Sequence, residues 1–376
     1  MTNNEDLVVE YIQTRDLSQN THYTIRSKLN HYSNFQGLSL QELIDEADQE
    51  EENGIRWKKR KLKTRLINYI NYCKQYMKIS SVKTYLSVVK SFYYYHEIEI
   101  YHLPPINHKN AEVSEPITYK DLPDKEIIRY AYELSIPVMR GVILFLASTG
   151  MSKVDALKLT IQDFIEATQE YHNEDNIDDV LRELRQYEDS IIPTWNNRRA
   201  KTNKYYVSFN TPECTDEILN YLELRQSKEK LQSSDPLFKI SGDYYTIQFQ
   251  IVNDIMGLGK VGAYNRFRGH MLRKFHASNL KKAGMDRYQI NVLQGKSNNS
   301  VDEVYFFEDI DKLKEDYIRY MDCLLIFTDV KEVTKYSSEY LSIVEENNKL
   351  KAQVEKVEQL EQDIQDIKSW YIFDDE

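Results

Sequence analysis

The sequence predicts a mainly α-helical protein with a small antiparallel β-sheet (α+β), built from two domains and a C-terminal helix. Apolar residues recur at helical spacing through most of the 376-residue chain. Two segments, 191–195 and 205–209, flank a polar turn and predict a β-hairpin. A polar stretch from Pro104 to Ser114 predicts a linker between a first domain, 1–110, and a second, 115–330. Residues 335–376 form a separate C-terminal segment.

The first domain is predicted to contain five helices. Their expected ranges are 6–14, 21–35, 40–48, 56–77 and 80–96. Tyrosines alternate with lysines on the last two of these helices. Tyrosine at helical spacing belongs to the core more often than to a binding surface, so the lysines carry more information about function.

The second domain is predicted to open with a helix at Asp121 or Pro123, followed by an apolar helix over 139–147. Ser152 and Asp155 have the spacing of a capping box at the start of the next helix. Lys153 lies in the first turn of that helix, where a cation opposes the helix dipole, so we expect it to face an anion. The alternative is a solvated lysine. The acidic stretch 166–189 predicts a surface helix or an insertion.

A cationic region follows in the sequence. His270 and Arg273 are three residues apart, which places them on one face of a helix that Gly284 should end. His276 lies on the same side and is interpreted as a packing residue. The next helix should run from Asp286 to Gly295 and leave Lys296 in a loop.

One tyrosine comes shortly after that loop. Ser300 and Glu303 form a capping box, so a helix should start near Val301 and carry Tyr305 on its second turn, near the positive end of the dipole. Such an arrangement can hold a phosphate group beside a phenol.

The net charge of −11 argues against a nucleic-acid partner, but the distribution of charge argues for one. The stretches 53–96 and 255–285 contain no acidic residue and many basic ones. A solvated face is the alternative explanation of each run. The candidate DNA contacts are Arg56, Lys58, Lys59, Lys61, Lys63, Arg65, Lys83, Lys90, Arg266, Arg268 and Lys274.

Composition excludes several other classes. No run of 18 apolar residues exists, and the N-terminus lacks the features of a signal peptide, so we expect a cytoplasmic protein with no membrane partner. Cys73, Cys214 and Cys323 are too far apart for a disulfide framework or a zinc site. No ligand cluster and no phosphate-binding glycine loop occurs, so neither a metal nor a nucleotide cofactor is implied.

The cationic region resembles the C-terminal motif of tyrosine recombinases (phage-type integrases). That motif reads His-x-x-Arg, then Gly-His or Gly-Lys, then the nucleophilic tyrosine nine residues on. Here it is matched in order by His270, Arg273, Gly295-Lys296 and Tyr305. The sequence from Leu272 to Leu280 is most similar to that of integrases of archaeal viruses and proviruses.

The resemblance implies a helical core-binding domain over 1–110, which clamps DNA, and a catalytic domain over 115–330. It also assigns roles. Tyr305 would attack to form a 3′-phosphotyrosine, and His270 would assist proton transfer. Arg273 and Lys296 would stabilise the transition state. Lys201 in the hairpin turn would protonate the leaving oxygen, with Lys204 as the second choice.

The first box of the family, Thr-Gly-x-Arg-x-x-Glu-x-x-x-Leu, is altered in this chain. Ser152 occupies the usual slot of the arginine and Lys153 follows it. We therefore assign the phosphate contact of this box to Lys153. The implied partners are double-stranded DNA at attachment sites and further copies of the chain, as a tetramer on paired sites. The implied role is integration or excision of a viral or mobile element. A type IB topoisomerase or a DNA-binding relative that does not cut DNA remains an alternative.

The C-terminal segment has the spacing of a short coiled coil with a stammer and a polar Asn347 in its seam. Packing of this helix onto its own domain is the alternative to self-association.

Overall fold

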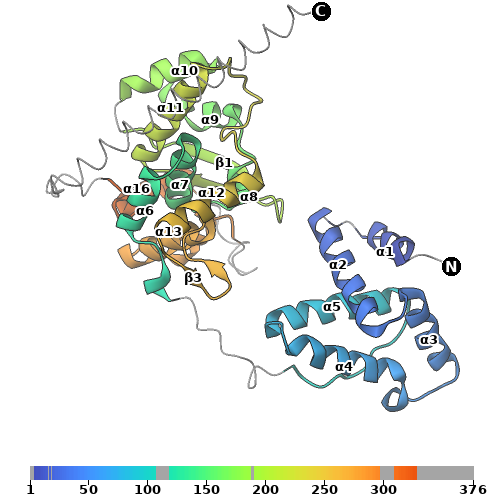
Figure 1. The fold of residues 1–376 in the computed structure, drawn as a ribbon. Coiled ribbons are helices and arrows are strands. Elements are labelled where there is room, and N and C mark those ends of the chain that lie inside the picture. The colour runs from blue at the N-terminus through green and yellow to red at the C-terminus, as the bar shows by residue number, and fades with distance from the viewer. Residues whose placement is uncertain are drawn as a thin grey trace, which may run out of the picture. The chain divides into compact units, whose positions relative to one another are not determined.

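The computed structural model describes residues 4–15, 17, 19–106, 118–187, 190–296 and 309–327 of the chain. It divides into two compact units, Met1–Glu115 and Pro116–Glu376 (Figure 1). The predicted coiled coil lies outside the described residues. Within the described ranges, no helix combines the length and the apolar character needed to cross a membrane.

The first unit is helical, as predicted. Its elements are α1 (Asn4–Gln13), α2 (Gln19–Gln36), α3 (Leu40–Glu52), a 3₁₀ turn (Trp57–Lys59), α4 (Lys61–Lys74) and α5 (Ile79–Tyr95). The core contains Leu29, Leu40, Leu66 and Val89, all fully buried. Tyr69 and Tyr93 are buried with them, whereas Tyr76 and Tyr94 are exposed.

The predicted helix over 56–77 is wrong at its start. Arg60 has an extended conformation, with φ −69° and ψ 138°, and separates the 3₁₀ turn from α4. Its guanidinium bonds to Glu51 and to the carbonyl of Ile55. These tertiary contacts favour a break that helical periodicity alone does not reveal.

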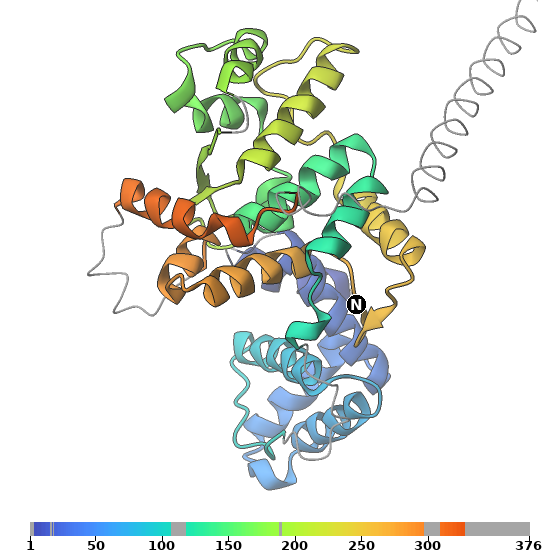
Figure 2. The ribbon, with the colours of Figure 1, turned by 90° about the vertical axis from the view of Figure 1, so that its left-hand side faces the viewer.

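The second unit is built around α7 (Pro137–Thr149). Almost every residue of this helix is buried, as expected for a helix that is apolar on all sides. α6 (Lys125–Glu133), α11 (Pro212–Gln226) and α13 (Gly269–Ala283) pack against it (Figures 1 and 2). The other helices in the described part of this unit are α8 (Lys153–Ala156), α9 (Ile161–Ala167), α10 (Ile177–Leu184), α12 (Gly242–Ile255), α14 (Arg287–Leu293) and α16 (Ile310–Tyr320), with 3₁₀ turns at Tyr119–Asp121, Gln169–Tyr171, Arg185–Tyr187 and Met321–Cys323.

The predicted hairpin is present. β1 (Thr194–Arg198) pairs antiparallel with β2 (Tyr205–Phe209), with Thr194 opposite Phe209 and Arg198 opposite Tyr205. β1 starts three residues later than predicted, beyond Pro193, which cannot donate a backbone hydrogen bond to a sheet. A second two-stranded sheet, β3 (Lys260–Val261) with β4 (Tyr264–Asn265), was not predicted.

The structure refines two other predictions for this unit. The opening helix α6 starts at Lys125, after the cap Asp124, because the Asp124 side chain accepts the Ile127 N–H. The acidic stretch, predicted as a surface helix or an insertion, contains α10 between two 3₁₀ turns, and Ile177, Val180 and Leu184 anchor one side of α10 to the core.

Candidate active site

Arg273 lies at the centre of the candidate site, on the buried side of α13. The helix ends at Gly284, as predicted, with φ 111°. Only 8% of Arg273 is exposed. Its Nη1 donates to the carbonyl of Gly150 at 2.5 Å and its Nη2 to the carbonyl of Gln294 at 2.7 Å. Burial lowers the pKa of Arg273 to about 10, and the positive charge of Arg199 contributes further.

The turn after α14 brings the Gly-Lys pair of the motif to Arg273. Asp286 caps α14, which runs over Arg287–Leu293 and is shorter at both ends than the predicted helix, and Gly295 adopts a left-handed φ of 59°. The Gln294 amide donates to the carbonyl of Arg273 at 2.8 Å. Burial is the main cause that lowers the pKa of Lys296, and the nearby positive charges of Arg273 and Arg199 lower it further.

The two histidines of α13 differ in environment. His276 is fully buried, its Nδ1 is 3.0 Å from the Gln294 amide, and burial lowers its pKa to about 3. It is a neutral packing residue, as predicted. His270 is accessible at the surface. Partial desolvation is the main cause that lowers the pKa of His270, and the charge of Lys274 lowers it further. The imidazole is therefore mainly neutral at neutral pH and can accept a proton.

The turn of the β1–β2 hairpin is anchored to α8. The Ala200 N–H donates to Asp155 Oδ1 at 2.8 Å, and Asp155 is buried. Lys201 and Lys204, the two predicted acids, lie in this turn with exposed side chains. The structure therefore places both lysines at the tip of a tethered hairpin.

Sequence reasoning missed Arg199, which opens the same turn. Its Nη1 donates to the carbonyl of Gly295 at 2.7 Å, next to the carbonyl that Arg273 uses. A signal was available in the sequence. Along a strand, alternate residues share a face. Arg199 follows the buried Trp195 at an even spacing, which places both residues on the same side of the hairpin.

Lys153 has partners other than the anion that we predicted. Ser152 caps α8, as expected, by accepting the Asp155 N–H. The Lys153 Nζ donates to the carbonyl of Gly242 at 2.5 Å and to Thr246 Oγ1 at 2.9 Å. It also lies 4.8 Å from the ring centroid of Tyr245. The ammonium thus joins α8 to the first turn of α12, and its assignment as a phosphate contact stays a prediction.

Comparison with known proteins gives structural matches only. No family model matches the chain, and no curated protein matches its sequence. The integrase of the Tn1549 transposon, in complex with transposon right end DNA, aligns with a TM-score of 0.50 at 13% identity over 85% of this chain and 99% of that one. A lambda integrase dimer bound to a core site aligns with a TM-score of 0.47 at 12% identity over 79% of this chain and 96% of that one.

This chain has the tyrosine-recombinase fold. In this fold, His270 and Arg273 lie on α13 and Lys296 lies in the turn after α14, and their assignment as site residues stays a prediction. Tyr305 lies outside the described residues. Among the residues that are described, no group of three or more His, Cys, Asp or Glu side chains could hold a metal ion.

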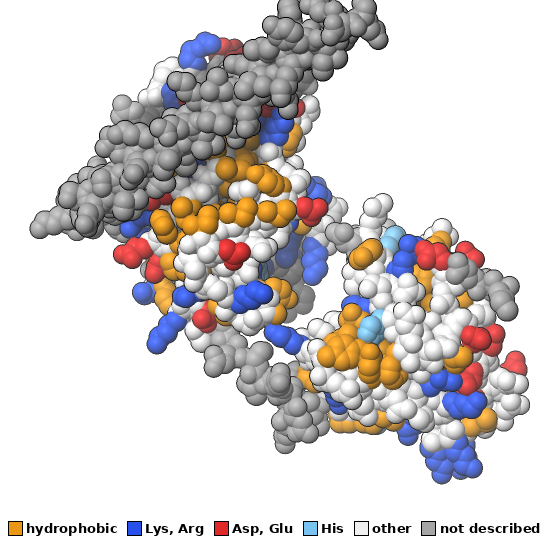
Figure 3. Space-filling model, viewed as in Figure 1, with side chains coloured by type: hydrophobic (Ala, Val, Ile, Leu, Met, Phe, Trp, Pro, Cys, Tyr) orange, Lys and Arg blue, Asp and Glu red, His pale blue; other side chains and the backbone are white. Residues whose placement is uncertain are grey.

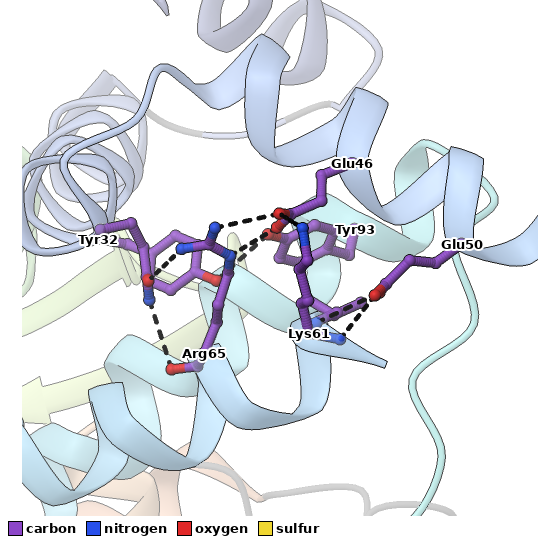
Figure 4. Close-up of polar contacts among 8 residues, drawn as sticks. Tyr32, Glu46, Glu50, Lys61, Arg65 and Tyr93 are labelled. Atoms are coloured by element: carbon purple, nitrogen blue, oxygen red, sulfur yellow. Dashed lines mark hydrogen bonds and ion pairs between the residues drawn. The ribbon is translucent and has the colours of Figure 1, made fainter. Parts of the chain in front are cut away.

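In the first unit, two of the predicted DNA contacts, Lys61 and Arg65, already have carboxylate partners (Figure 4). Arg65 donates from Nε and Nη2 to the two oxygens of Glu46, at 2.6 and 3.2 Å. Lys61 Nζ donates to Glu46 Oε1 at 3.0 Å, and the Lys61 N–H donates to Glu50 Oε1 at 2.7 Å. The Arg65 hydrogen bond is the main reason that the pKa of Glu46 is lowered. A phosphate would have to compete with Glu46 for these two cations.

The other predicted contacts vary in exposure. Arg56, Lys58, Lys59 and Lys83 are exposed, while Lys63 and Lys90 are half-buried. In the second unit, Arg266 donates to the carbonyl of Lys120 at 2.8 Å. Arg268 packs 5.1 Å from the ring centroid of Tyr264, and Lys274 is half-buried. On the face in Figure 3, basic and acidic side chains of the described residues lie interspersed within each unit.

Proposed function

We propose that this protein is a site-specific DNA recombinase that cleaves and rejoins DNA through a 3′-phosphotyrosine intermediate. One observation carries the proposal. Arg273 and the segment Gln294–Lys296 are joined by two hydrogen bonds in a scaffold of the tyrosine-recombinase fold: the guanidinium donates to the carbonyl of Gln294, and the Gln294 amide donates to the carbonyl of Arg273. Tyr305 follows this segment at the spacing of the motif.

The proposed reaction has three parts. The Tyr305 oxygen attacks the scissile phosphorus, and its proton passes to His270, whose lowered pKa suits an acceptor. Arg273 and Lys296 stabilise the charge that develops on the non-bridging oxygens. The bond from phosphorus to the 5′ oxygen breaks, and Lys201 protonates that oxygen. Attack by a 5′ hydroxyl of another strand reverses the sequence and rejoins the DNA.

The proposed partner is double-stranded DNA at paired attachment sites, on which copies of the chain assemble as a tetramer. The Tn1549 integrase, which aligns over almost its whole length, was solved with transposon DNA. We extend this by analogy to the integration or excision of a viral or mobile element. In the first unit, the exposed Lys58 and Lys59 supply charge for phosphate contacts.

A duplex carrying a nick beside the scissile phosphate tests the proposal. Cleavage releases a short fragment, so the covalent protein–DNA adduct accumulates and is measured on a denaturing gel. We expect an adduct with the wild type and none with Tyr305→Phe, which removes only the attacking oxygen. Absence of an adduct from the wild type would leave a DNA-binding protein that does not cut. An adduct without strand transfer to a second duplex would indicate a type IB topoisomerase.

A further inference from the structure

We propose that Arg199 is a further catalytic residue of this site, whose guanidinium acts together with that of Arg273 on the non-bridging oxygens of the scissile phosphate. This inference rests on the function proposed above. It assigns the second arginine of the site to the β1–β2 hairpin, a part of the chain in which the sequence pointed only to lysines.

Two guanidinium groups from separate elements converge on one short segment. Arg273 Nη2, from α13, donates to the carbonyl of Gln294 at 2.7 Å. Arg199 Nη1, from the hairpin, donates to the carbonyl of Gly295 at 2.7 Å. Consecutive Cα atoms of a chain are only about 3.8 Å apart. The two side chains are therefore near neighbours, and Lys296 follows directly.

The Asp155 carboxylate acts on Arg273 only at a distance, where it raises the pKa of the guanidinium, so the positive charges of this cluster are only partly offset. Within the described residues, neither Arg199 nor Arg273 forms an ion pair with an acidic side chain. Arginine keeps its proton at any physiological pH, so the two positive charges persist side by side. This repulsion contributes to the lowered pKa of Arg273, after burial. An anion that binds between the two guanidinium groups offsets the repulsion, and the transition state, with more negative charge than the bound phosphodiester, offsets it most.

Arg199 has a suitable position for this task, and most of its guanidinium donors are not used by the described residues. Its backbone N–H donates to the carbonyl of Lys204 at 2.9 Å, which closes the turn. The next residue, Ala200, is tied to the buried Asp155. The guanidinium has one hydrogen-bond partner among the described residues, Gly295, and the side chain is half-buried. Nothing in the described part of the chain accepts from its other N–H donors, which can therefore bind a ligand.

The structure favours Arg199 over Lys153 for this contact. Lys153 has its ammonium at Gly242 and Thr246 of α12, and Ser152, its neighbour, is an uncharged helix cap. Arginine presents a planar fork that binds two phosphate oxygens at once, whereas lysine is a point charge. Because an arginine is a poor proton donor, the role of Arg199 is charge stabilisation, and Lys201 keeps the role of acid.

The test measures single-turnover cleavage of the nicked duplex by the full chain. Arg199→Ala removes the side chain. Arg199→Gln keeps an N–H donor for Gly295 but removes the charge. Arg198→Ala is the matched control, because Arg198 is the adjacent, exposed arginine of the same hairpin. Loss of one preorganised contact to the transition state typically slows the reaction about 10²–10³-fold. We expect that loss for both Arg199 variants, with DNA affinity nearly unchanged, and the wild-type rate for Arg198→Ala.

A second substrate separates a charge contact from a structural role. It carries a neutral methylphosphonate in place of the scissile phosphate, so one non-bridging oxygen and its charge are removed. If Arg199 neutralises that charge, its variants should lose much less on this substrate than on the phosphate. Equal losses on both substrates would overturn the inference and leave Arg199 as a support for the Gly295 turn.

The remaining outcomes are equally decisive. Cleavage of the phosphate by Arg199→Gln at the wild-type rate would refute the need for the charge. A large loss in Lys153→Ala, with none in Arg199→Ala, would return the role to Lys153. If the wild type binds but does not cleave, the proposed function fails, and the inference fails with it. If the wild type cleaves and the Arg199 variants match Arg198→Ala, only the inference fails.

Discussion

Replacing Gly295 by alanine tests how tightly the candidate site is packed. Gly295 has a left-handed φ of 59°, and an added Cβ would lie 2.8, 2.9 and 3.0 Å from three ring carbons of Tyr206. Contacts of this length force the ring or the turn to move. Tyr206 is only 3% exposed, so the ring has little room to yield.

The expected loss has two components. A side chain in the left-handed region costs about 1–2 kcal/mol. Repacking around an overfilled position costs about 1–3 kcal/mol more. The free energy of unfolding should therefore fall by about 2–5 kcal/mol in Gly295→Ala. Gly257→Ala is the matched control, because Gly257 has a φ of 62° and no neighbouring atom within 4 Å of an added Cβ. It should show the first component alone.

Urea unfolding measures the difference. Trp195 is 1% exposed and reports on the core of the second unit. The chain has three tryptophans, so replacing Trp57 and Trp370 by phenylalanine leaves Trp195 as the only one. With unchanged slopes, a lower midpoint for Gly295→Ala than for Gly257→Ala would support the argument. Equal midpoints would show that the ring of Tyr206 yields without cost, which would refute it.

A functional consequence follows from the same geometry. The carbonyl of Gly295 accepts the hydrogen bond of Arg199, and Lys296 is the next residue. A displaced turn should therefore slow the cleavage of nicked DNA at a temperature where both variants are folded. Cleavage by Gly257→Ala should remain near the wild-type rate.

Three further predictions concern the nucleophile and the first unit. Tyr305→Phe should keep the affinity for DNA and lose the covalent adduct; an adduct in this variant would mean that another tyrosine attacks. Glu46→Gln should cost about 1–2 kcal/mol at pH 7, because it weakens a charged hydrogen bond to Arg65. The pKa of Glu46 is lowered in the folded state, so this contribution to stability is present above the unfolded pKa and is lost as pH falls through the folded pKa. The free energies of unfolding of the wild type and the variant should therefore converge in acid. Reversing Lys58 and Lys59 to Glu should weaken binding to any duplex and reduce the slope of log affinity against log salt by about 2, and an unchanged slope would place the phosphate contacts elsewhere.

Local sequence determined much of the fold and the position of the motif. The cap at Ser152, the stop at Gly284 and the strand 205–209 are found where the sequence predicts them, and α14 starts one residue after the predicted Asp286. These features depend on contacts between residues a few positions apart, and periodicity and capping preferences report on such contacts directly.

Only the tertiary structure decided which cations are engaged and by what. Arg65 meets Glu46 across 19 positions, Lys153 meets Gly242 across 89, and Arg199 meets Gly295 across 96. A basic residue has the same local signature whether it binds a carboxylate, a carbonyl or solvent. Its partner depends on which distant segment the core brings beside it. In the second unit, the apolar packing of α7 with α11 and α13 sets that arrangement.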